Sequence, residues 1–243
     1  MSNAVEIWQI PLQVSESALQ SYWRCLSNDE QARADRFHFP DDKRRFTVAR
    51  GTLRYLLGTQ VGRLPHELTF CYGPYGKPSL GQVMIDQGRQ EPQLVAKSGS
   101  EACDFHFNIS HSGELALCVL GGTRRVGIDI EKFKPMQRLE SMMERCLSSQ
   151  EQIEVSATER PAEAFLWRWT CKEAYLKAIG LGLSQSMKTV EVDMAIPRLV
   201  RVPQDCPEGW TLHKVDVPKE YAGALVVAGD APIQFSQWQH ALV

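Results

Sequence analysis

The sequence lacks any marked excess of one charge sign: 27 Lys and Arg stand against 29 Asp and Glu, a net charge of -2. That balance argues against a general nucleic-acid coat protein and against a polybasic membrane binder. No apolar run approaches the roughly 20 residues that span a bilayer, and the first residues lack the basic flank and apolar stretch of a signal peptide. We therefore expect a cytoplasmic protein without nucleic-acid or membrane partners.

Several familiar motifs are also missing. The seven cysteines are odd in number, widely scattered and never arranged as CxxC, so we expect reduced thiols with neither disulfides nor zinc. No HExxH or GxSxG is present. Gly122 and Gly127 have P-loop spacing, but Ile128 and Asp129 follow where Lys and Ser or Thr should stand.

What the sequence does contain is two similar sets of strand-like segments, each around a pair of expected helices near 29–58 and 148–180. The strand-like segments are 5–12, 68–72, 105–109 and 115–120 in the first set, and 126–130, 189–194, 211–217 and 224–228 in the second. This order predicts an α/β (α+β) fold of two pseudo-symmetric subdomains, 1–124 and 125–243, each a small mostly antiparallel sheet packed with helices. The aperiodic stretch 81–104 is expected to be a surface loop.

The sharpest local signal is Val126-Gly127-Ile128-Asp129-Ile130-Glu131. Strict alternation places Asp129 and Glu131 on one face of a strand and the isoleucines on the other. The two carboxylates can converge on one cation, but they repel each other if left unpaired. A strand with an ordinary solvated face explains an isolated Asp-x-Glu equally well, so the neighbouring segments decide the interpretation.

The segment before this strand places further polar groups beside the acids. The run 115–120, the turn-like 121–125 and the acidic strand together predict a β-hairpin. Such pairing brings Asn108-Ile109-Ser110-His111-Ser112 to the same edge as Asp129 and Glu131. A lone histidine is most often structural, but one between two serines beside carboxylates can bind phosphate oxygens.

A third segment, 165–180, predicts a helix entered at Pro161 and closed at Gly180. Its apolar stripe comprises Trp167, Cys171, Ala174, Tyr175 and Ala178. Glu173 and Lys177 fall on the opposite side, where the simplest interpretation is a solvated pair worth about 0.3 to 0.5 kcal/mol. The functional interpretation makes Glu173 a third carboxylate beside Asp129 and Glu131 for Mg²⁺, with Lys172 and Lys177 facing an anionic substrate.

Two further basic positions stand out upstream. Arg50 projects close to the apolar stripe of its helix, so it should be partly buried and need an anionic partner. Gly73-Pro74-Tyr75-Gly76-Lys77-Pro78 is a stiff turn that presents one lysine, either as part of a plain loop or as a phosphate clamp. We count Arg50 and Lys77 among the candidates for binding the substrate.

Taken in order, 107–112, 127–131 and 169–177 closely resemble the signature of the surfactin-synthetase-activating (Sfp) type of 4'-phosphopantetheinyl transferase. The resemblance extends through 76–78 and 33–57, and it implies two pseudo-symmetric α/β halves in a monomer. It also implies that 1–124 contacts the nucleotide of coenzyme A and that 125–243 carries the magnesium site and the catalytic helix. The longer 81–104 stretch departs from the family pattern.

The resemblance further implies the roles of individual residues. Asp129, Glu131 and Glu173 correspond to the Mg²⁺ ligands that hold the coenzyme A diphosphate. The positions that match phosphate contacts are Lys77, Ser110, His111, Lys172 and Lys177, with Arg45 near the adenosine 3'-phosphate and Arg33 at a variable basic position nearby. Asp129, Glu173 and Lys177 are the implied catalytic residues, with Glu173 or a metal-bound water as the base.

The implied reaction moves the 4'-phosphopantetheine arm of coenzyme A onto a serine of an apo acyl or peptidyl carrier protein. Such carriers serve fatty-acid, polyketide and nonribosomal peptide biosynthesis, and the sequence does not choose among them. Two alternatives stay open at this point. One is a non-catalytic binder of coenzyme A or nucleotide, and the other is a metal-dependent phosphoesterase.

Overall fold

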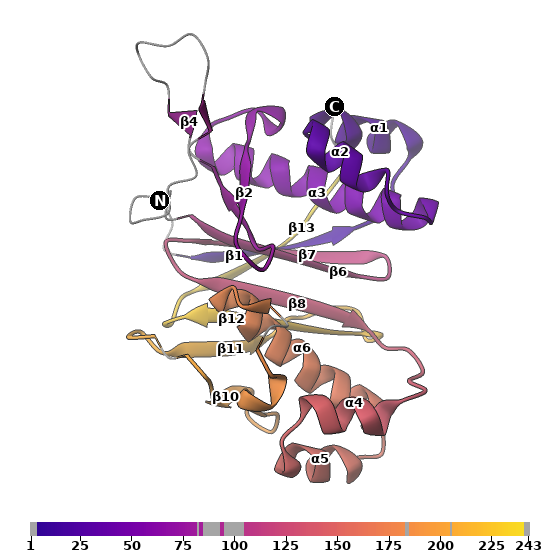
Figure 1. The fold of residues 1–243 in the computed structure, drawn as a ribbon, viewed down its shortest axis with the longest axis vertical. Coiled ribbons are helices and arrows are strands. Elements are labelled where there is room, and N and C mark those ends of the chain that lie inside the picture. The colour runs from indigo at the N-terminus through magenta and orange to yellow at the C-terminus, as the bar shows by residue number, and fades with distance from the viewer. Residues whose placement is uncertain are drawn as a thin grey trace.

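A computed structural model describes residues 4–81, 83–84, 93–94, 105–182, 185–204 and 206–240. Its core is two sheets between two layers of helices (Figure 1). The first sheet has the order β13-β1-β7-β6, with β1 at Val5–Pro11, β6 at His106–Ser112, β7 at Leu115–Gly122 and β13 at Ile233–Gln237. The second has the order β11-β12-β8, with β8 at Val126–Lys132, β11 at Trp210–Lys214 and β12 at Tyr221–Ala228.

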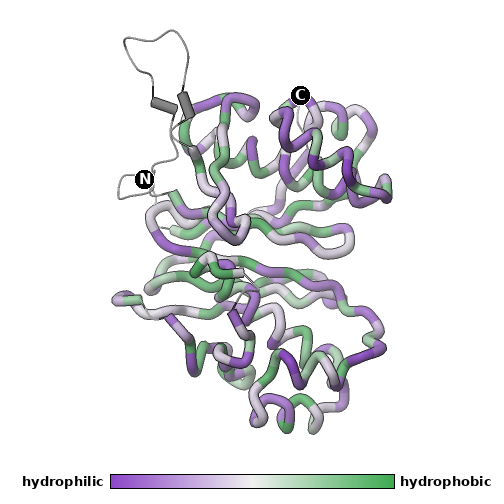
Figure 2. The backbone as a smooth tube through the Cα atoms, viewed as in Figure 1, coloured by the Kyte–Doolittle hydropathy of each residue, from purple (hydrophilic) through white to green (hydrophobic). Residues whose placement is uncertain are grey.

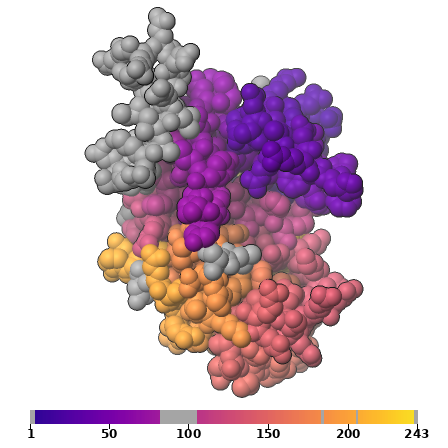
Figure 3. All heavy atoms as spheres, viewed as in Figure 1, coloured from indigo at the N-terminus to yellow at the C-terminus, as the bar shows by residue number. Residues whose placement is uncertain are grey.

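Each sheet is covered on its outer face by helices of its own half (Figures 1 and 3). The first half carries α1 at Glu16–Cys25, α2 at Asn28–Ala34 and α3 at Pro40–Val61, and the second carries α4 at Leu139–Cys146, α5 at Ser149–Ser156 and α6 at Pro161–Ile179. Smaller elements are the pairs β2 (Phe70–Tyr72) with β3 (Pro78–Leu80), β4 (Val83–Met84) with β5 (Gln93–Leu94) and β9 (Glu191–Asp193) with β10 (Arg198–Arg201), and the 3-10 turns η1 (Pro65–Glu67) and η3 (Met187–Thr189). The predicted fold class, small antiparallel sheets packed with helices, is confirmed.

Strand β7 is buried on both faces, and this explains its central position. Ala116 and Cys118 pack into the core beneath α3, whereas Leu117 and Val119 pack into the core between the two sheets. Hydrophobic residues recur along the strands of both sheets (Figure 2). A strand with two apolar faces is stable only where both faces are covered. For β7, helix α3 covers one face and the second sheet covers the other.

The predicted hairpin between β7 and β8 is wrong. Strand β7 is hydrogen-bonded to β1 and β6, and β8 pairs with β12 in the other sheet. The turn between them, in which the Arg124 N–H donates to the Gly121 carbonyl at 3.0 Å, passes the chain from one sheet to the other. Gly122 adopts a φ of 58° there, a left-handed conformation that glycine adopts readily.

The expected limits of α6 are confirmed. The helix begins at Pro161, whose missing N–H is no loss in a first turn, and Gly180 caps it with a φ of 76°. Strand β13 was not predicted: it pairs in parallel with β1 and so returns the C-terminal end of the chain to the first sheet. The division at 124 and 125 stays a prediction, and most of the predicted 81–104 loop lies outside the described residues.

No helix in the described part of the chain combines the length and apolar character required to cross a membrane.

Candidate active site

The two acids of β8 face helix α6, as the alternation of the strand requires. Ile128 and Ile130 point into the core between the sheets, which turns Asp129 and Glu131 toward the helix. Gly127 allows the helix to lie very close, since a Cβ atom there would be 2.1 Å from the Ala174 carbonyl oxygen. This close crossing of β8 and α6 sets the distance between the acids and the polar side of the helix.

Asp129 is the centre of a compact polar cluster. Its side chain is nearly fully buried, and its Oδ1 accepts hydrogen bonds from Lys177 Nζ at 2.6 Å and from Ser110 Oγ at 2.7 Å. Lys177 Nζ also donates to Ser110 Oγ at 2.8 Å. Three segments that are distant in sequence, namely β6, β8 and α6, therefore meet at one carboxylate.

Glu131 repeats this arrangement two residues further along β8. Ser112 Oγ donates to its Oε2 at 2.8 Å, and the Lys132 N–H donates to the same hydroxyl at 3.0 Å. Burial raises the pKa of the Glu131 carboxyl, and the negative charge of Asp129 raises it further. Ser110 and Ser112 thus pair with Asp129 and Glu131 in register.

The carboxyl group of Glu173, on α6, has a pKa well above its usual range. Burial, followed by repulsion from Asp129, raises the pKa of its carboxyl to about 7. Its Oε1 is buried without a hydrogen-bond partner among the described residues, and the same holds for Oδ2 of Asp129. Buried carboxylate oxygens without partners are unfavourable, so this pair of atoms marks a place where a positive ligand would be stabilised.

The donor chemistry at this place fits a hard divalent cation. Carboxylate oxygens are the ligands that Mg²⁺ prefers. The charge of Asp129 raises the pKa of both Glu131 and Glu173, and a cation bound among the three acids would relieve that repulsion. Among the described residues, however, no three acidic, histidine or cysteine side chains already form a group that could hold an ion. The Lys177 ammonium occupies Oδ1 of Asp129 in this arrangement, whereas Oδ2 is left without a partner among the described residues.

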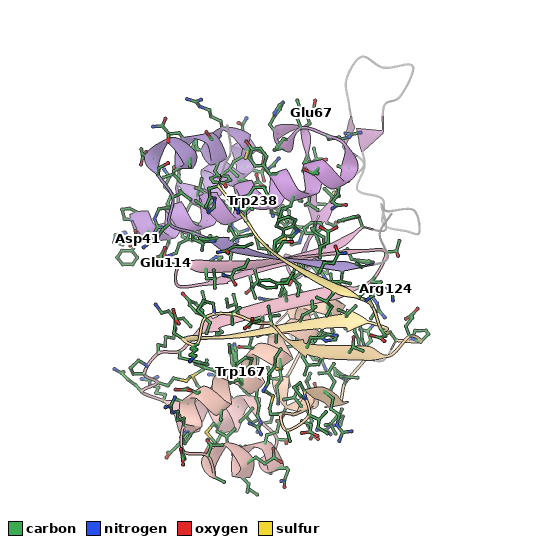
Figure 4. The ribbon with its side chains drawn as sticks, turned by 180° about the vertical axis from the view of Figure 1, so that it is seen from behind. Asp41, Glu67, Glu114, Arg124, Trp167 and Trp238 are labelled. Atoms are coloured by element: carbon green, nitrogen blue, oxygen red, sulfur yellow. The ribbon has the colours of Figure 1, made fainter. Side chains whose placement is uncertain are left out.

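A second charged group lies at the turn between β6 and β7. The Glu114 carboxylate accepts from both Arg44 and Arg45, and these ion pairs tie the turn to the start of α3. Glu114 and Asp41 lie at the same edge of the molecule (Figure 4). His111 of β6 keeps part of its surface exposed, but its ring is packed among protein atoms. This desolvation, followed by the charges of Lys177 and Arg45, lowers its pKa.

Lys172 lies away from this cluster, with its ammonium turned into the protein, and its contact with substrate phosphate stays a prediction. Its side chain is fully buried, and its Nζ donates to Glu151 Oε2 at 2.6 Å and to the carbonyls of Cys146 at 2.9 Å and Met187 at 3.3 Å. All three ammonium donors are therefore occupied within the protein. Adjacent residues on a helix point about 100° apart, so Lys172 and Glu173 cannot both face the acids of β8.

Arg50 and Lys77 also have internal partners. Arg50 is buried as expected, with its anionic partner in Glu30 and a further bond of 2.7 Å to the Tyr72 hydroxyl, and its contact with coenzyme A stays a prediction. Lys77 Nζ donates to the backbone carbonyls of Lys177 at 2.6 Å, Ala178 at 3.1 Å and Val126 at 3.4 Å. The lysine of the stiff turn thus binds the end of α6, and its predicted contact with phosphate stays a prediction.

Sequence reasoning missed some residues of the site and misjudged one. Ser112 was not singled out, although its two-residue spacing from Ser110 repeats the spacing of the two acids. Asn108 also orders the site, since its Oδ1 accepts the Ile128 N–H at 2.9 Å. The solvated strand face that was the alternative interpretation of the two acids does not hold for Asp129, which is 3 % exposed because α6 covers it.

The two α/β halves meet where β6, β8 and α6 bring acids and a lysine together. This fold and this polar site are typical of a mixed α/β enzyme. Residues 12–123 match the family described as 4'-phosphopantetheinyl transferase, N-terminal, and residues 125–226 match the 4'-phosphopantetheinyl transferase superfamily. The chain belongs to this superfamily and is a transferase.

Individual relatives agree with this placement. The 4'-phosphopantetheinyl transferase HetI of Nostoc sp. is 37% identical over 231 residues, which cover 94% of this chain and 90% of that protein. The 4'-phosphopantetheinyl transferase Sfp of Bacillus subtilis is 27% identical over 181 residues, or 74% of this chain and 71% of that protein. The crystal structure of Thermotoga maritima holo-[acyl-carrier-protein] synthase is 29% identical over 43% of this chain and 62% of its own, with a TM-score of 0.35, too low to carry an argument.

Proposed function

We propose that this transferase moves 4'-phosphopantetheine from coenzyme A to a serine of an apo acyl or peptidyl carrier protein, releasing adenosine 3',5'-bisphosphate. Membership of the superfamily supports the reaction. The single observation that supports the site is the cluster at Asp129, where Lys177 and Ser110 meet one carboxylate and Glu173 lies close enough to feel its charge. This arrangement places an acid, a base and a cation around one point.

Glu173 is the proposed proton acceptor. Without a bound cation the pKa of its carboxyl is about 7, so this group can hold a proton near neutral pH. The carrier serine oxygen attacks the phosphorus that bears the pantetheine arm, and its proton passes to Glu173. The bond from that phosphorus to the bridging oxygen of the pyrophosphate breaks, and the electron pair leaves with adenosine 3',5'-bisphosphate.

Lys177 is the proposed stabiliser of the leaving group. Negative charge grows on the bridging oxygen as the bond breaks, and a preorganised ammonium in a partly buried site stabilises that charge strongly. Lys177 Nζ is already held by Asp129 and Ser110, so little reorganisation is needed when the charge appears. Ser110, exposed His111 and Arg45 are the further groups proposed to bind the phosphates of coenzyme A.

Asp129, Glu131 and Glu173 are the residues proposed to hold Mg²⁺. When bound there, Mg²⁺ would supply positive charge to the pyrophosphate oxygens. The unpaired oxygens of Asp129 and Glu173 support this assignment. We retain the division into residues 1–124, which contribute nucleotide contacts, and 125–243, which contribute the acids and α6. The boundary between the two family matches, at 123 and 125, supports it.

The test of this proposal is conversion of an apo carrier protein by the purified protein. The protein is incubated with coenzyme A, MgCl₂ and several apo acyl and peptidyl carriers, and intact mass is measured on each carrier. A gain equal to one phosphopantetheine arm supports the transfer. Release of adenosine bisphosphate without carrier modification would indicate a phosphoesterase, and coenzyme A binding with neither product would indicate a non-catalytic binder.

A further inference from the structure

Lys77 connects the two halves of the molecule at the end of the helix that carries Lys177. It stands on the turn between β2 and β3, which belongs to the first half, and its Nζ reaches backbone carbonyls of α6 and β8 in the second half. The turn itself is fixed by backbone bonds from Gly76 N to Gly73 O at 2.9 Å and from Gly73 N to Lys77 O at 3.0 Å. The lysine therefore projects from a rigid support.

The β2–β3 pair is itself anchored to the first half. The Arg50 guanidinium lies 4.0 Å from the centre of the Phe70 ring and donates to the Tyr72 hydroxyl. Phe70 also packs edge-on against Phe107 of β6, with ring centres 6.0 Å apart. Movement of the Lys77 ammonium is thus limited by contacts with both α3 and the first sheet.

The last carbonyls of a helix have no partners within the helix, and the helix dipole makes that end negative. An ammonium group at this end satisfies both requirements. Lys77 Nζ lies 2.6 Å from the carbonyl oxygen of Lys177 and 3.1 Å from that of Ala178. The group is largely withdrawn from water, and this desolvation lowers the pKa of Lys77 to about 8, so it remains mostly charged at neutral pH.

The carbonyl that Lys77 binds belongs to the residue whose side chain pairs with Asp129. Fixing the main chain of Lys177 fixes the origin of its side chain, whose Nζ lies 2.6 Å from Asp129 Oδ1. The last two turns of the same helix are seated against Gly127, where a Cβ atom would lie 2.1 Å from the Ala174 carbonyl oxygen and 2.3 Å from the Ala178 nitrogen. Gly127 and Lys77 therefore both hold the part of α6 that carries Lys177.

We propose that Lys77 is a positioning residue for the transfer reaction, which holds the end of α6 so that Lys177 meets Asp129 and the substrate, and that Lys77 does not itself bind phosphate. This inference rests on the proposed transfer function. The three ammonium donors of Lys77 face three carbonyls, so Lys77 would have to release the helix end in order to contact a phosphate.

The test is a set of variants assayed by carrier modification at varied coenzyme A concentration. Lys77→Met removes the three bonds, Lys77→Gln keeps donors without the charge, and Lys219→Met is the control at an exposed lysine. A displacement of about 1 Å at a reacting group can lower the rate about a hundredfold. We expect kcat of Lys77→Met to fall tenfold to a hundredfold, with a smaller loss in Lys77→Gln and KM for coenzyme A within about twofold of the parent.

A double-mutant cycle distinguishes positioning from a phosphate contact made only in the transition state. If Lys77 acts through Lys177, Lys77→Met should cost little further rate in a Lys177→Met background. A further loss there as large as in the parent protein would overturn the inference. So would a tenfold rise in KM for coenzyme A, or unchanged kcat in Lys77→Met.

Hydrogen exchange gives a readout that does not depend on activity. Amides of the last turn of α6 and of 180–182 should exchange faster in Lys77→Met, while those of β12 stay protected. Exchange unchanged at the helix end would contradict the inference. Exchange raised throughout would mark a folding defect, and the decision then rests on Lys77→Gln measured in the same way. Absence of transfer by the parent protein would reject the proposed function instead, leaving the exchange result to judge Lys77.

Discussion

The ammonium of Lys177, on α6, lies 2.6 Å from Oδ1 of Asp129, on β8, in a site where Asp129 is almost fully buried. This contact joins the helix to the strand that carries two of the three acids of the seam. It also leaves Oδ2 of Asp129 and Oε1 of Glu173 without partners among the described residues. The site therefore contains carboxylate oxygens that the Lys177 ammonium does not neutralise, and the predictions on pH and Mg²⁺ below follow from that excess of negative charge.

The pH dependence of stability should carry the signature of Glu173. Its pKa is raised from about 4.5 to about 7, so folding favours the protonated form. The stabilisation of the folded state by this protonated carboxyl is fully present below pH 4.5 and is lost as pH rises through 7. The resulting loss in the free energy of unfolding is on the order of 3 kcal/mol. Urea unfolding in EDTA should therefore show stability falling between pH 5 and 8, and Glu173→Gln should reduce that slope. An equal slope in both proteins would contradict the assigned pKa.

Magnesium should stabilise the folded protein without any substrate. A ligand that binds only the native state at a hundred times its Kd adds about 2.7 kcal/mol. In thermal melts at pH 8, the Tm of the parent protein should rise with MgCl₂ concentration, and the Tm of Asp129→Asn should not change. NaCl at matched ionic strength controls for screening. Equal shifts in both proteins would place the ion elsewhere.

Removing Lys172 should affect stability and leave substrate affinity intact. Its ammonium pairs with buried Glu151, and breaking a buried pair by removing one partner costs about 3 to 5 kcal/mol. We expect Lys172→Met to lower the free energy of unfolding by that amount, while exposed Lys188→Met does not. At a temperature where both variants are folded, KM for coenzyme A should match the parent. A raised KM with unchanged stability would restore Lys172 as a phosphate ligand.

A methyl group at Gly127 should separate α6 from β8. The added Cβ would meet the Ala174 carbonyl oxygen at 2.1 Å, and backbone atoms cannot move aside as a side chain can. Overpacking of this kind costs about 1 to 3 kcal/mol, and the displaced helix should also slow transfer. Gly73→Ala is the matched control for stability, since its nearest atom would be 3.7 Å away, and Lys219→Met is the control for kcat because Gly73 lies on the turn that carries Lys77. Chemical denaturation and kcat measured on both variants decide the matter, and normal kcat in Gly127→Ala would show that the helix can shift without consequence.

The acidic strand, the polar segment 108–112 and helix α6 could be predicted from the sequence because each depends on local periodicity and caps. Strand alternation placed Asp129 and Glu131 on one face, and Pro161 and Gly180 marked the ends of α6. The proximity of Ser110 to Asp129 was also expected, but through the wrong pairing. Strands β7 and β8 belong to different sheets and form no hairpin. Instead, side chains of β6 reach β8 directly, through Ser110 and Asn108.

What could not be predicted depends on tertiary packing. A lysine beside Glu173 looks like a substrate contact until α5 is seen to place Glu151 against Lys172. Lys77 looks like an exposed clamp until the end of α6 is seen to meet its turn. Strand β13 pairs with β1 across almost the whole length of the chain, and no local pattern encodes such a pairing.

The most direct test of the account compares the parent protein with Asp129→Asn in carrier modification. Each is incubated with coenzyme A, MgCl₂ and the same apo carrier, and intact mass is followed over time, with circular dichroism to show that both are folded. The account predicts that the parent adds one phosphopantetheine arm and that Asp129→Asn is slower by at least about a hundredfold, since the acid and the Lys177 alignment are both lost. Transfer by a folded Asp129→Asn at the parent rate would contradict it.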